Sequence, residues 1–350
     1  PIFDSKEFKE EIHRVSKLKM VNCEMLSDEF DEFYKTFKKF TSMGKYENYH
    51  FTCTGALANE AAIKTAMWYK GPRPDGYILS IKNSFHGINS VGNIFLTLNF
   101  GRLFFTSRFP GVKLRQGDIP GEYNWPVANT IKDAISHVQS NPYNLQGVIV
   151  EPIQATYGDN YLNKKELQSL SKICKQFDIP LIFDEVQTGF LSSGTVWYST
   201  QLKIEPDIIV YGKKSQVSGI MVKKSHSKVF ENQKRLSVTY DGDLVDMIRC
   251  KYIIDTIDNN QLKKNVNKQG KRLFKELNKL SNIHNIRQTG LLIAFDFKTT
   301  KLRDDFCSKL FSNKMICNPT GTHSVRMRPN LAVNSEEINM AIDIIKLSLN

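Results

Sequence analysis

Residues 182–189 read IFDEVQTG, and residues 206–214 read PDIIVYGKK. The first stretch runs from apolar residues into Asp184, and the second runs from apolar residues into Lys213. Short apolar runs bounded by polar residues are typical of strands that are buried on both faces. A carboxylate and an amine therefore follow two buried strands, and this arrangement decides the fold class.

Strand-like runs alternate with helix-like segments through the middle of the chain. We expect a helix at residues 164–177 and strands at 77–81, 147–150, 180–183 and 208–211. This alternation predicts an α/β fold with a mainly parallel sheet. Because binding sites in such sheets lie at the carboxyl ends of the strands, we expect Glu151, Asp184 and Lys213 to converge there.

These residue types suit an enzyme that uses pyridoxal 5'-phosphate (PLP). A buried carboxylate such as Asp184 keeps the pyridine nitrogen protonated, and a lysine amine forms a Schiff base with the aldehyde. The alternative role for Asp184 is to cap the next helix. Lys213 and Lys214 are adjacent, so one of them faces the cofactor, and an ordinary surface lysine pair is the alternative.

Smaller motifs supply the rest of a cofactor site. Gly55 and Ala56 lie between an expected strand and helix, where backbone N–H groups can hold a phosphate. Phe85 could stack on one ring face and Val186 on the other, with His86 nearby. The alternative is a core phenylalanine beside a loop histidine. Gln187 can reach the phenolic oxygen of the cofactor.

The composition excludes several classes of protein. Apolar residues make up 41% and charged residues 24% of the 350 residues, as in ordinary globular proteins. The net charge of +12 would suit nucleic acid, but the lysines are dispersed, so we expect no specific nucleic-acid partner. The six cysteines show no close metal-binding spacing. Without an apolar span or a signal-peptide pattern, we expect a cytoplasmic protein without membrane contact.

The pattern of apolar and polar residues divides the chain into three parts. Residues 1–45 read as an N-terminal helical segment with an aromatic stripe, residues 46–240 as a large cofactor-binding domain, and residues 241–350 as a smaller α+β domain. The helical spacing of the aromatic residues predicts that the stripe lies in the core or in a subunit interface. The stripe consists of Phe30, Phe33, Tyr34, Phe37 and Phe40.

The ordered motifs resemble the class III (ω-) aminotransferases, which have PLP fold type I. The resemblance rests on TGA at 54–56, SFHG at 84–87, EPIQ at 151–154, DEVQTG at 184–189 and GK at 212–213. Within the class the chain is most similar to the L-lysine 6-aminotransferases, through GALA at 55–58, GKKSQV at 212–217 and GDLVDMIR at 242–249. That family moves the ε-amino group of lysine to 2-oxoglutarate in two half-reactions.

The resemblance implies a role for each matching residue. It favours Lys213 over Lys214 as the Schiff-base lysine, and it makes Asp184 the partner of the pyridine nitrogen. Thr239 matches a threonine that reaches the phosphate of the neighbouring subunit, which implies a homodimer. Arg326 matches the arginine that binds a carboxylate of the 2-oxo acid, and Glu151 lies on the substrate side of the site.

The sequence departs from the family pattern at two positions that concern the substrate. Ile88 replaces an arginine that binds a substrate carboxylate, a loss of about 1.5–3 kcal/mol unless Arg102 or Arg108 substitutes. Thr156 replaces a glutamate that pairs with the arginine at 326, which leaves Arg326 unpaired and available.

Three alternatives to a lysine aminotransferase stay open. Family members normally have some tens of residues before the point that matches Pro1, so one alternative is a truncated or inactive PLP-binding relative. Another is a class III enzyme with a different donor, such as ornithine, 4-aminobutyrate, diaminobutyrate or an amine without a carboxylate. The third is a nucleic-acid-binding protein, suggested by charge alone.

Overall fold

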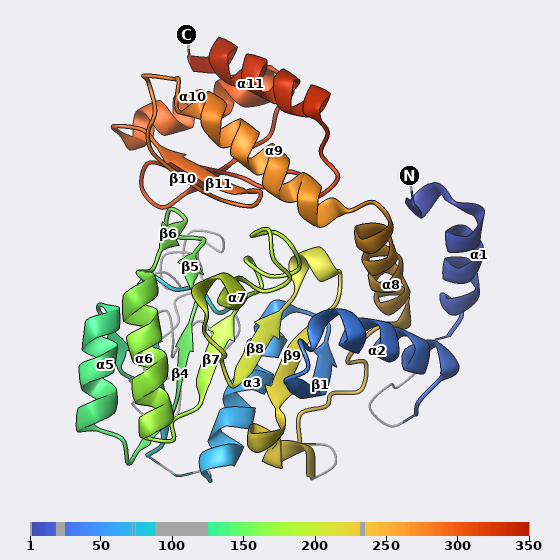
Figure 1. The fold of residues 1–350 in the computed structure, drawn as a ribbon, viewed down its shortest axis with the longest axis vertical. Helices are drawn as coiled ribbons and strands as arrows, with labels where there is room; N and C mark the ends of the chain where they lie inside the picture. The colour runs from blue at the N-terminus through green and yellow to red at the C-terminus, as the bar shows by residue number, and fades with distance from the viewer. Residues whose placement is uncertain are drawn as a thin grey trace, which may run out of the picture.

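A computed structural model describes residues 2–18, 25–71, 73, 75–87, 125–231 and 235–349 of the chain. Figure 1 shows a large sheet in the lower half and a smaller sheet, with helices α9 to α11, in the upper half. The predicted fold class is confirmed: the large sheet is mostly parallel, and the smaller sheet belongs to the C-terminal part of the chain.

The large sheet has seven strands in the order β1-β9-β8-β7-β4-β2-β3. All but one point the same way, because β9 pairs antiparallel with both β1 and β8. The bounds are β1 Tyr46–Thr52, β2 Tyr77–Ile81, β3 Val127–Ala128, β4 Leu145–Val150, β7 Leu181–Asp184, β8 Ile208–Tyr211 and β9 Ser218–Lys223. Strand β9 and helix α5 (Ile131–Ser140) were not expected from the sequence.

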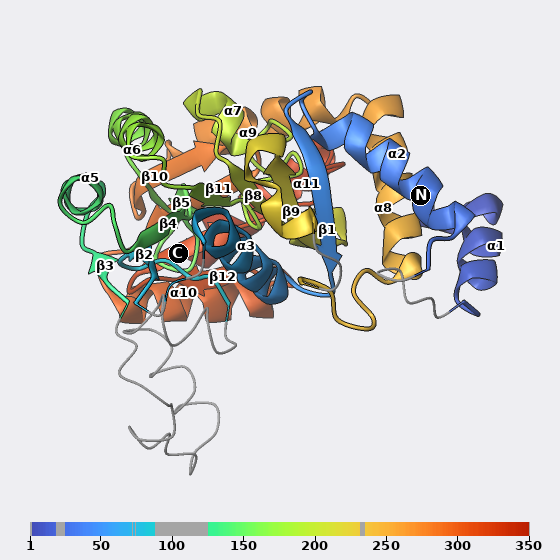
Figure 2. The same ribbon diagram turned by 90° about the horizontal axis from the view of Figure 1, so that it is seen from below.

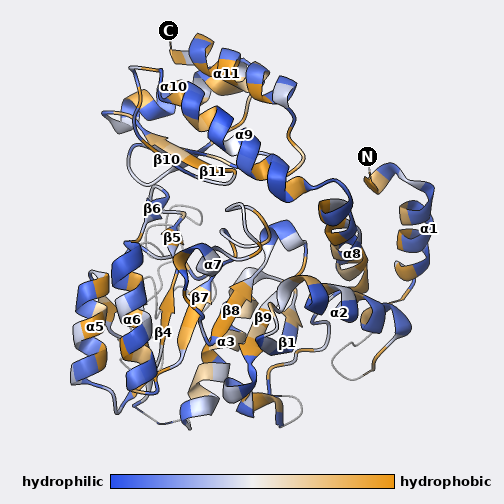
Figure 3. Cartoon of the chain, in the orientation of Figure 1, coloured by the Kyte–Doolittle hydropathy of each residue, from blue (hydrophilic) through white to orange (hydrophobic). Residues whose placement is uncertain are grey.

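The central strands are buried on both faces, as Figure 3 shows by their hydrophobic colour. Side chains alternate along each strand: Val148 and Phe183 pack under α5 and α6 (Lys164–Gln176), whereas Ile149 and Ile182 pack under α3 (Gly55–Lys70). Figure 2 shows α5 and α6 together, apart from α3. The apolar layers on the two faces of the sheet keep the carboxyl ends of the parallel strands along one edge.

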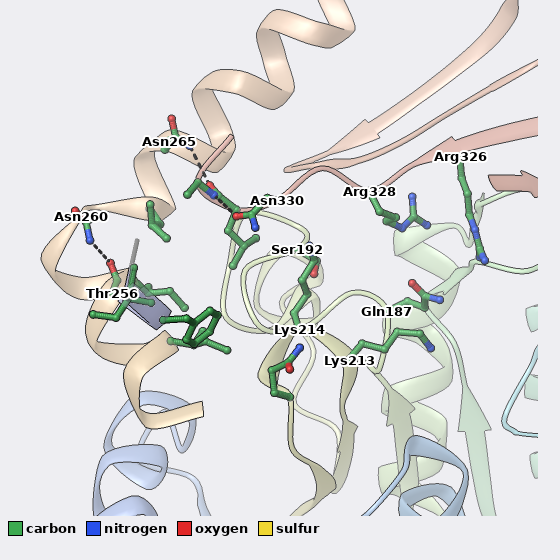
Figure 4. Close-up of a pocket in the computed structure, with 18 of the residues that line it drawn as sticks. Gln187, Ser192, Lys213, Lys214, Thr256, Asn260, Asn265, Arg326, Arg328 and Asn330 are labelled. Carbon is green, nitrogen blue, oxygen red and sulfur yellow. Dashed lines mark hydrogen bonds between the residues drawn. The ribbon is translucent and has the colours of Figure 1, made fainter. Parts of the chain in front are cut away.

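The smaller sheet is antiparallel, in the order β10-β11-β13-β12. Its strands are β10 His284–Thr289, β11 Leu292–Asp296, β12 Asn318–Thr320 and β13 Ser324–Met327, and its helices are α9 Leu262–Leu277, α10 Thr300–Ser312 and α11 Ser335–Leu349. Apolar side chains of these elements continue into one cluster with α2 (Asp28–Thr41). This cluster positions β13, so that Arg326 in the strand and Arg328 just after it lie above the edge of the large sheet (Figure 4).

The N-terminal part consists of α1 (Lys6–Val15) and α2, within the segment that was expected to be helical. Phe33 and Phe37 of the aromatic stripe are fully buried, with the other three rings packed beside them, so the core prediction is confirmed. Helix α8 (Leu244–Asn259) packs on α2 and links the N-terminal helices to α9. Within the described residues, no helix is long and apolar enough to span a membrane.

Two short elements complete the described structure. A two-stranded ribbon pairs β5 (Ile153–Gln154) with β6 (Asn160–Tyr161), and α7 (Tyr198–Leu202) follows the segment after β7. The buried Glu185 accepts the N–H groups of Tyr198 and Ser199 and so fixes the start of α7. The segment 184–189 is therefore fixed to the start of α7 by the hydrogen bonds of Glu185.

Candidate active site

Asp184 is the last residue of β7, at the centre of the large sheet, and is buried. Its Oδ2 accepts a hydrogen bond from Asn59 Nδ2 at 2.9 Å and lies 2.9 Å from His86 Nδ1. Its Oδ1 accepts the N–H of Val186 at 3.1 Å. Helix α3 and the loop after β2 thus aim donors at one carboxylate, which holds it in a single orientation.

His86 is fully buried against Asp184, so the loop-histidine alternative does not describe it. A carboxylate accepts hydrogen bonds, so the Nδ1 of His86 donates to it. The other ring nitrogen, Nε2, is buried and has no partner in the described part of the chain. His86 therefore orients Asp184 from one side while Asn59 holds it from the other.

Glu151 follows β4 directly and lies beside this group. Its Oε1 accepts the N–H of Phe85 at 2.6 Å, and its Oε2 accepts the N–H of Ala155 at 3.4 Å. Burial and the charge of Asp184 raise the pKa of Glu151 well above its usual range. Gln154 donates to the carbonyl of Lys82 at 2.6 Å, so the EPIQ segment positions the loop that carries Phe85 and His86.

Lys213 begins a 3-10 turn after β8 and has left-handed backbone geometry, with φ of 55°. Its side chain is accessible from the cavity, yet protein surrounds the amine. Burial lowers the pKa of Lys213, and the charges of Arg326 and Arg328 lower it further, whereas Asp184 and Glu151 oppose this shift. Lys213 lines the same cavity as the two arginines and is close enough to the two carboxylates to sense their charge.

Lys214 points elsewhere. Its Nζ donates to the carbonyl of Pro329 at 3.1 Å, in the segment that leaves β13. Figure 4 shows the two adjacent lysine side chains diverging, with the end of Lys213 toward Gln187. The two adjacent amines therefore lie in different surroundings, which their order in the sequence alone does not indicate.

A cavity of about 1120 Å³ opens over the strand ends. The segments that follow β7 and β8 contribute Gln187 and Lys213 to its lining. Strand β12 contributes Asn318, β13 contributes Arg326, and the segment after β13 contributes Arg328. Arg326 Nη1 donates to the carbonyl of Ala155 at 2.7 Å. No carboxylate in the described residues forms an ion pair with Arg326, as expected from Thr156, but its guanidinium is hydrogen-bonded rather than free.

The phosphate-binding candidates lie at the start of α3, a helix of 16 residues. Gly55 and Ala56 occupy its first turn, where N–H groups have no helical partner. A Cβ on Gly55 would lie 3.2 Å from Val186, so the missing side chain lets Val186 approach closely. Asn59 links the carbonyl of Gly55 to Asp184, so the start of α3, Val186 and Asp184 are neighbours.

The remaining candidates divide into two groups. Phe85 is half-buried, and its backbone N–H donates to Glu151. Thr239 is exposed in the loop before α8 and does not line the cavity of its own chain. Ile88, Arg102 and Arg108 lie outside the described residues.

Asn59 is a site residue that the sequence analysis missed. It is buried, and its amide group bridges the carbonyl of Gly55 at 3.1 Å and Asp184. The available signal was its place one helical turn after Gly55, on the same face of α3. Asn59 couples the phosphate-binding turn to the carboxylate.

The lowered pKa of Lys213 predicts how cofactor uptake depends on pH. Uptake needs the neutral amine, and a lysine with lowered pKa loses its proton below 10.5, its ordinary value. We expect the rate at which cofactor-free protein takes up PLP, followed by visible absorbance, to rise with pH and level off before 10.5. Arg326→Met removes a nearby positive charge and moves this rise to higher pH. A rate that climbs steadily through 10.5 contradicts the assignment.

A buried carboxylate and a lysine that follow neighbouring parallel strands, with a helix start beside the carboxylate, are the groups that a PLP-dependent enzyme of fold type I needs. Comparisons with known proteins agree. The sequence matches the family Aminotransferase class-III over residues 12–349, so the chain belongs to the class III aminotransferases, which transfer amino groups with PLP.

The most similar relatives include L-lysine-epsilon aminotransferases. The protein of that name from Mycobacterium bovis is 30% identical, with 99% of this chain and 83% of the relative covered. The one from Streptomyces clavuligerus is 28% identical, with 99% and 82% covered. A 4-aminobutyrate aminotransferase from Schizosaccharomyces pombe is 29% identical over 81% of this chain and 68% of its own length.

A solved structure agrees with the fold and the class. The lysine aminotransferase from M. tuberculosis in the internal aldimine form superposes with a TM-score of 0.89 and 29% identity, covering 99% of this chain and 85% of that one. The fold of this chain is thus that of a PLP-bound aminotransferase.

Proposed function

We propose that this aminotransferase moves the ε-amino group of L-lysine to 2-oxoglutarate. The observation that carries the proposal is that Lys213, which follows the strand next to the one that ends in Asp184, lines the same cavity as Arg326 of β13. An amine for the chemistry and a guanidinium for a carboxylate are what an amino-acid donor and a 2-oxo acid acceptor require. Similarity to L-lysine-epsilon aminotransferases points to lysine as the donor.

The residues would divide the work as follows. Bound PLP supplies an aldehyde that links to an amine and a ring that accepts an electron pair. The Asp184 carboxylate would keep the ring nitrogen protonated. The hydrogen bonds from Asn59 and His86 would hold this carboxylate in its orientation. Lys213 Nζ moves a proton from the carbon that bears the amino group.

The contacts around the ring and the substrate follow the family pattern. Phe85 and Val186 would enclose the ring, Gln187 would contact its phenolic oxygen, and Gly55 and Ala56 would bind the phosphate through backbone N–H groups. Arg326 would bind a carboxylate of the 2-oxo acid, with Glu151 beside it.

A comparison of donors tests the proposed function. We expect kcat/KM with L-lysine, at fixed 2-oxoglutarate, to exceed that with ornithine, 4-aminobutyrate or 2,4-diaminobutyrate by about tenfold or more, since each of these places the carboxylate differently. Glutamate formation is the readout. The second candidate donor is 4-aminobutyrate, favoured by the similarity to the S. pombe enzyme, and a higher value for it would replace lysine in the proposal.

We also propose a homodimer in which Thr239 reaches the cofactor phosphate of the partner subunit. Support comes from its exposure outside the cavity of its own chain. Thr239→Ala should weaken PLP binding about 10- to 100-fold, the range for a hydrogen bond to a charged group.

Mixed dimers distinguish the two possible arrangements. We expect subunits carrying Lys213→Ala, mixed with subunits carrying Thr239→Ala, to regain one working site per dimer. That site combines an intact Lys213 with a Thr239 donated by the partner. Mixing that restores no PLP affinity would mean that Thr239 serves its own chain or no site.

A further inference from the structure

Lys214 lines the cavity without a role in the function proposed above. It is half-buried, and its amine carries three N–H donors, of which the carbonyl of Pro329 takes one. Among the described residues, no carboxylate forms an ion pair with it. A cation enclosed in this way is costly unless an anion joins it, so the position favours an anionic ligand.

Arg328 is the second cation on this side of the cavity. Its Nη2 donates to Asp159 Oδ1 at 2.6 Å, and the Asp159 side chain is fully buried. The pair is neutral as a unit, and it holds the guanidinium in place. The carbonyl that accepts from Lys214 belongs to Pro329, the residue after Arg328, and both cations line the cavity, so the two groups lie on the same side of it.

The positive charge of Lys214 is therefore the one left unmatched around Arg328. Arg326 is a separate group, since it donates to Ala155 rather than to Asp159. The cavity thus offers two cationic positions, one at Arg326 and one at Lys214 with Arg328. Two such positions match a substrate with two carboxylates, or two substrates that present a carboxylate at different distances from the reacting carbon.

The sequence supplies a reason for a second position. Ile88 stands where related enzymes have an arginine for a substrate carboxylate, and an isoleucine side chain cannot bind one. Among the described residues, the cations that line the cavity are the candidates to take that carboxylate. Lys214 is adjacent in sequence to Lys213 and lines the same cavity, so the cavity connects it to the reacting amine.

We propose that Lys214, beside Arg328, binds the substrate carboxylate remote from the reacting carbon. The inference rests on the proposed function, and it names the class of substrate: an ω-amino acid as donor and a 2-oxo dicarboxylate as acceptor. The hydrogen bond to Pro329 orients the amine, and the two remaining donors take the carboxylate oxygens.

The test separates the charge of Lys214 from its hydrogen bond. Lys214→Gln keeps a donor for the Pro329 carbonyl and removes the charge. With holoenzyme, we expect the apparent dissociation constant for L-lysine in the first half-reaction to rise about 10- to 100-fold. For 1,5-diaminopentane, which has the same terminal amine and no carboxylate, we expect a change of less than about twofold. Lys214→Arg should retain most of the affinity for L-lysine.

The control is Lys165→Gln, which removes an exposed lysine charge from α6 and should change neither donor. A second readout avoids turnover: glutarate, titrated into holoenzyme by calorimetry, should bind about 10- to 100-fold more weakly to Lys214→Gln, while the visible cofactor band stays unchanged.

The outcomes judge the two proposals separately. Wild-type protein that fails to react with either amine sinks the proposed function, and the glutarate titration still judges Lys214. Equal losses for both amines, unchanged glutarate binding, or no glutarate binding to wild-type protein overturn the inference. If Lys214→Gln behaves as wild type throughout, Lys214 merely anchors Pro329 and the inference is wrong.

Discussion

Replacing Lys213 by alanine should abolish turnover and the visible band of the linked cofactor. The variant loses both the amine that holds PLP and the group that moves the proton, and proton transfer by a placed side chain alone is worth roughly 100- to 10,000-fold. The measurement combines steady-state rates with the visible spectrum of PLP-treated protein. The spectrum reports attachment of the cofactor independently of any choice of donor.

Lys214→Ala is the matched control, because the two lysines are adjacent and both line the cavity. It should keep the visible band and weaken substrate binding only. Borohydride reduction of the PLP-treated wild type, followed by peptide mass analysis, should place the label on Lys213. A label on Lys214, or loss of the band in Lys214→Ala alone, would show that the assignment of the two amines is reversed.

Replacing Asp184 by asparagine should lower kcat by on the order of 100- to 1,000-fold, the usual cost of removing one preorganised electrostatic contact. Asparagine keeps the shape of the side chain but cannot hold a proton on the ring nitrogen. It also leaves the donors of Asn59 and His86 facing a neutral amide, which loses the charge assistance of those hydrogen bonds. PLP affinity should fall in parallel.

Asp305→Asn serves as the control for this change, since Asp305 is exposed on α10. It should leave both kcat and PLP affinity within about twofold of wild type, as is usual for surface substitutions. An Asp184→Asn variant with near-normal kcat would mean that another group keeps the ring nitrogen protonated, and Glu151 would become the candidate.

The positions of Asp184, Glu151 and Lys213 could be predicted from the sequence because strand ends of a parallel sheet share one edge. Each follows an uninterrupted apolar run, and β4, β7 and β8 are parallel neighbours as expected. The helix expected at residues 164–177 was equally predictable and is observed as α6, Lys164–Gln176.

The contacts around Asp184 could not be predicted in this way. Asn59, His86 and Asp184 meet across 98 to 125 residues of sequence, so their encounter depends on how α3 and the loop after β2 pack on the sheet. The divergence of Lys213 and Lys214 depends on the left-handed φ of Lys213, which a Gly-Lys-Lys sequence does not specify. The same holds for Asp159 and Arg328, which join the turn between β5 and β6 to the segment after β13.

Strand β9 illustrates a different limit. Its sequence SGIMVK contains a glycine and follows the Lys213 turn closely, so no period marked it as a strand. A Cβ on Gly219 would lie 2.2 Å from the carbonyl oxygen of His50, so the glycine is needed for the close approach of β1. A glycine usually weakens a strand, but here Gly219 permits the pairing of β9 with β1.

The most direct test of the central claim is the visible absorbance spectrum of the purified protein with PLP, recorded before and after L-lysine and then after 2-oxoglutarate. We predict a band from the cofactor linked to Lys213, its disappearance on adding L-lysine, and its return on adding 2-oxoglutarate. A band that persists with L-lysine but disappears with another amine would contradict lysine as the donor. Absence of any band would contradict the cofactor site itself.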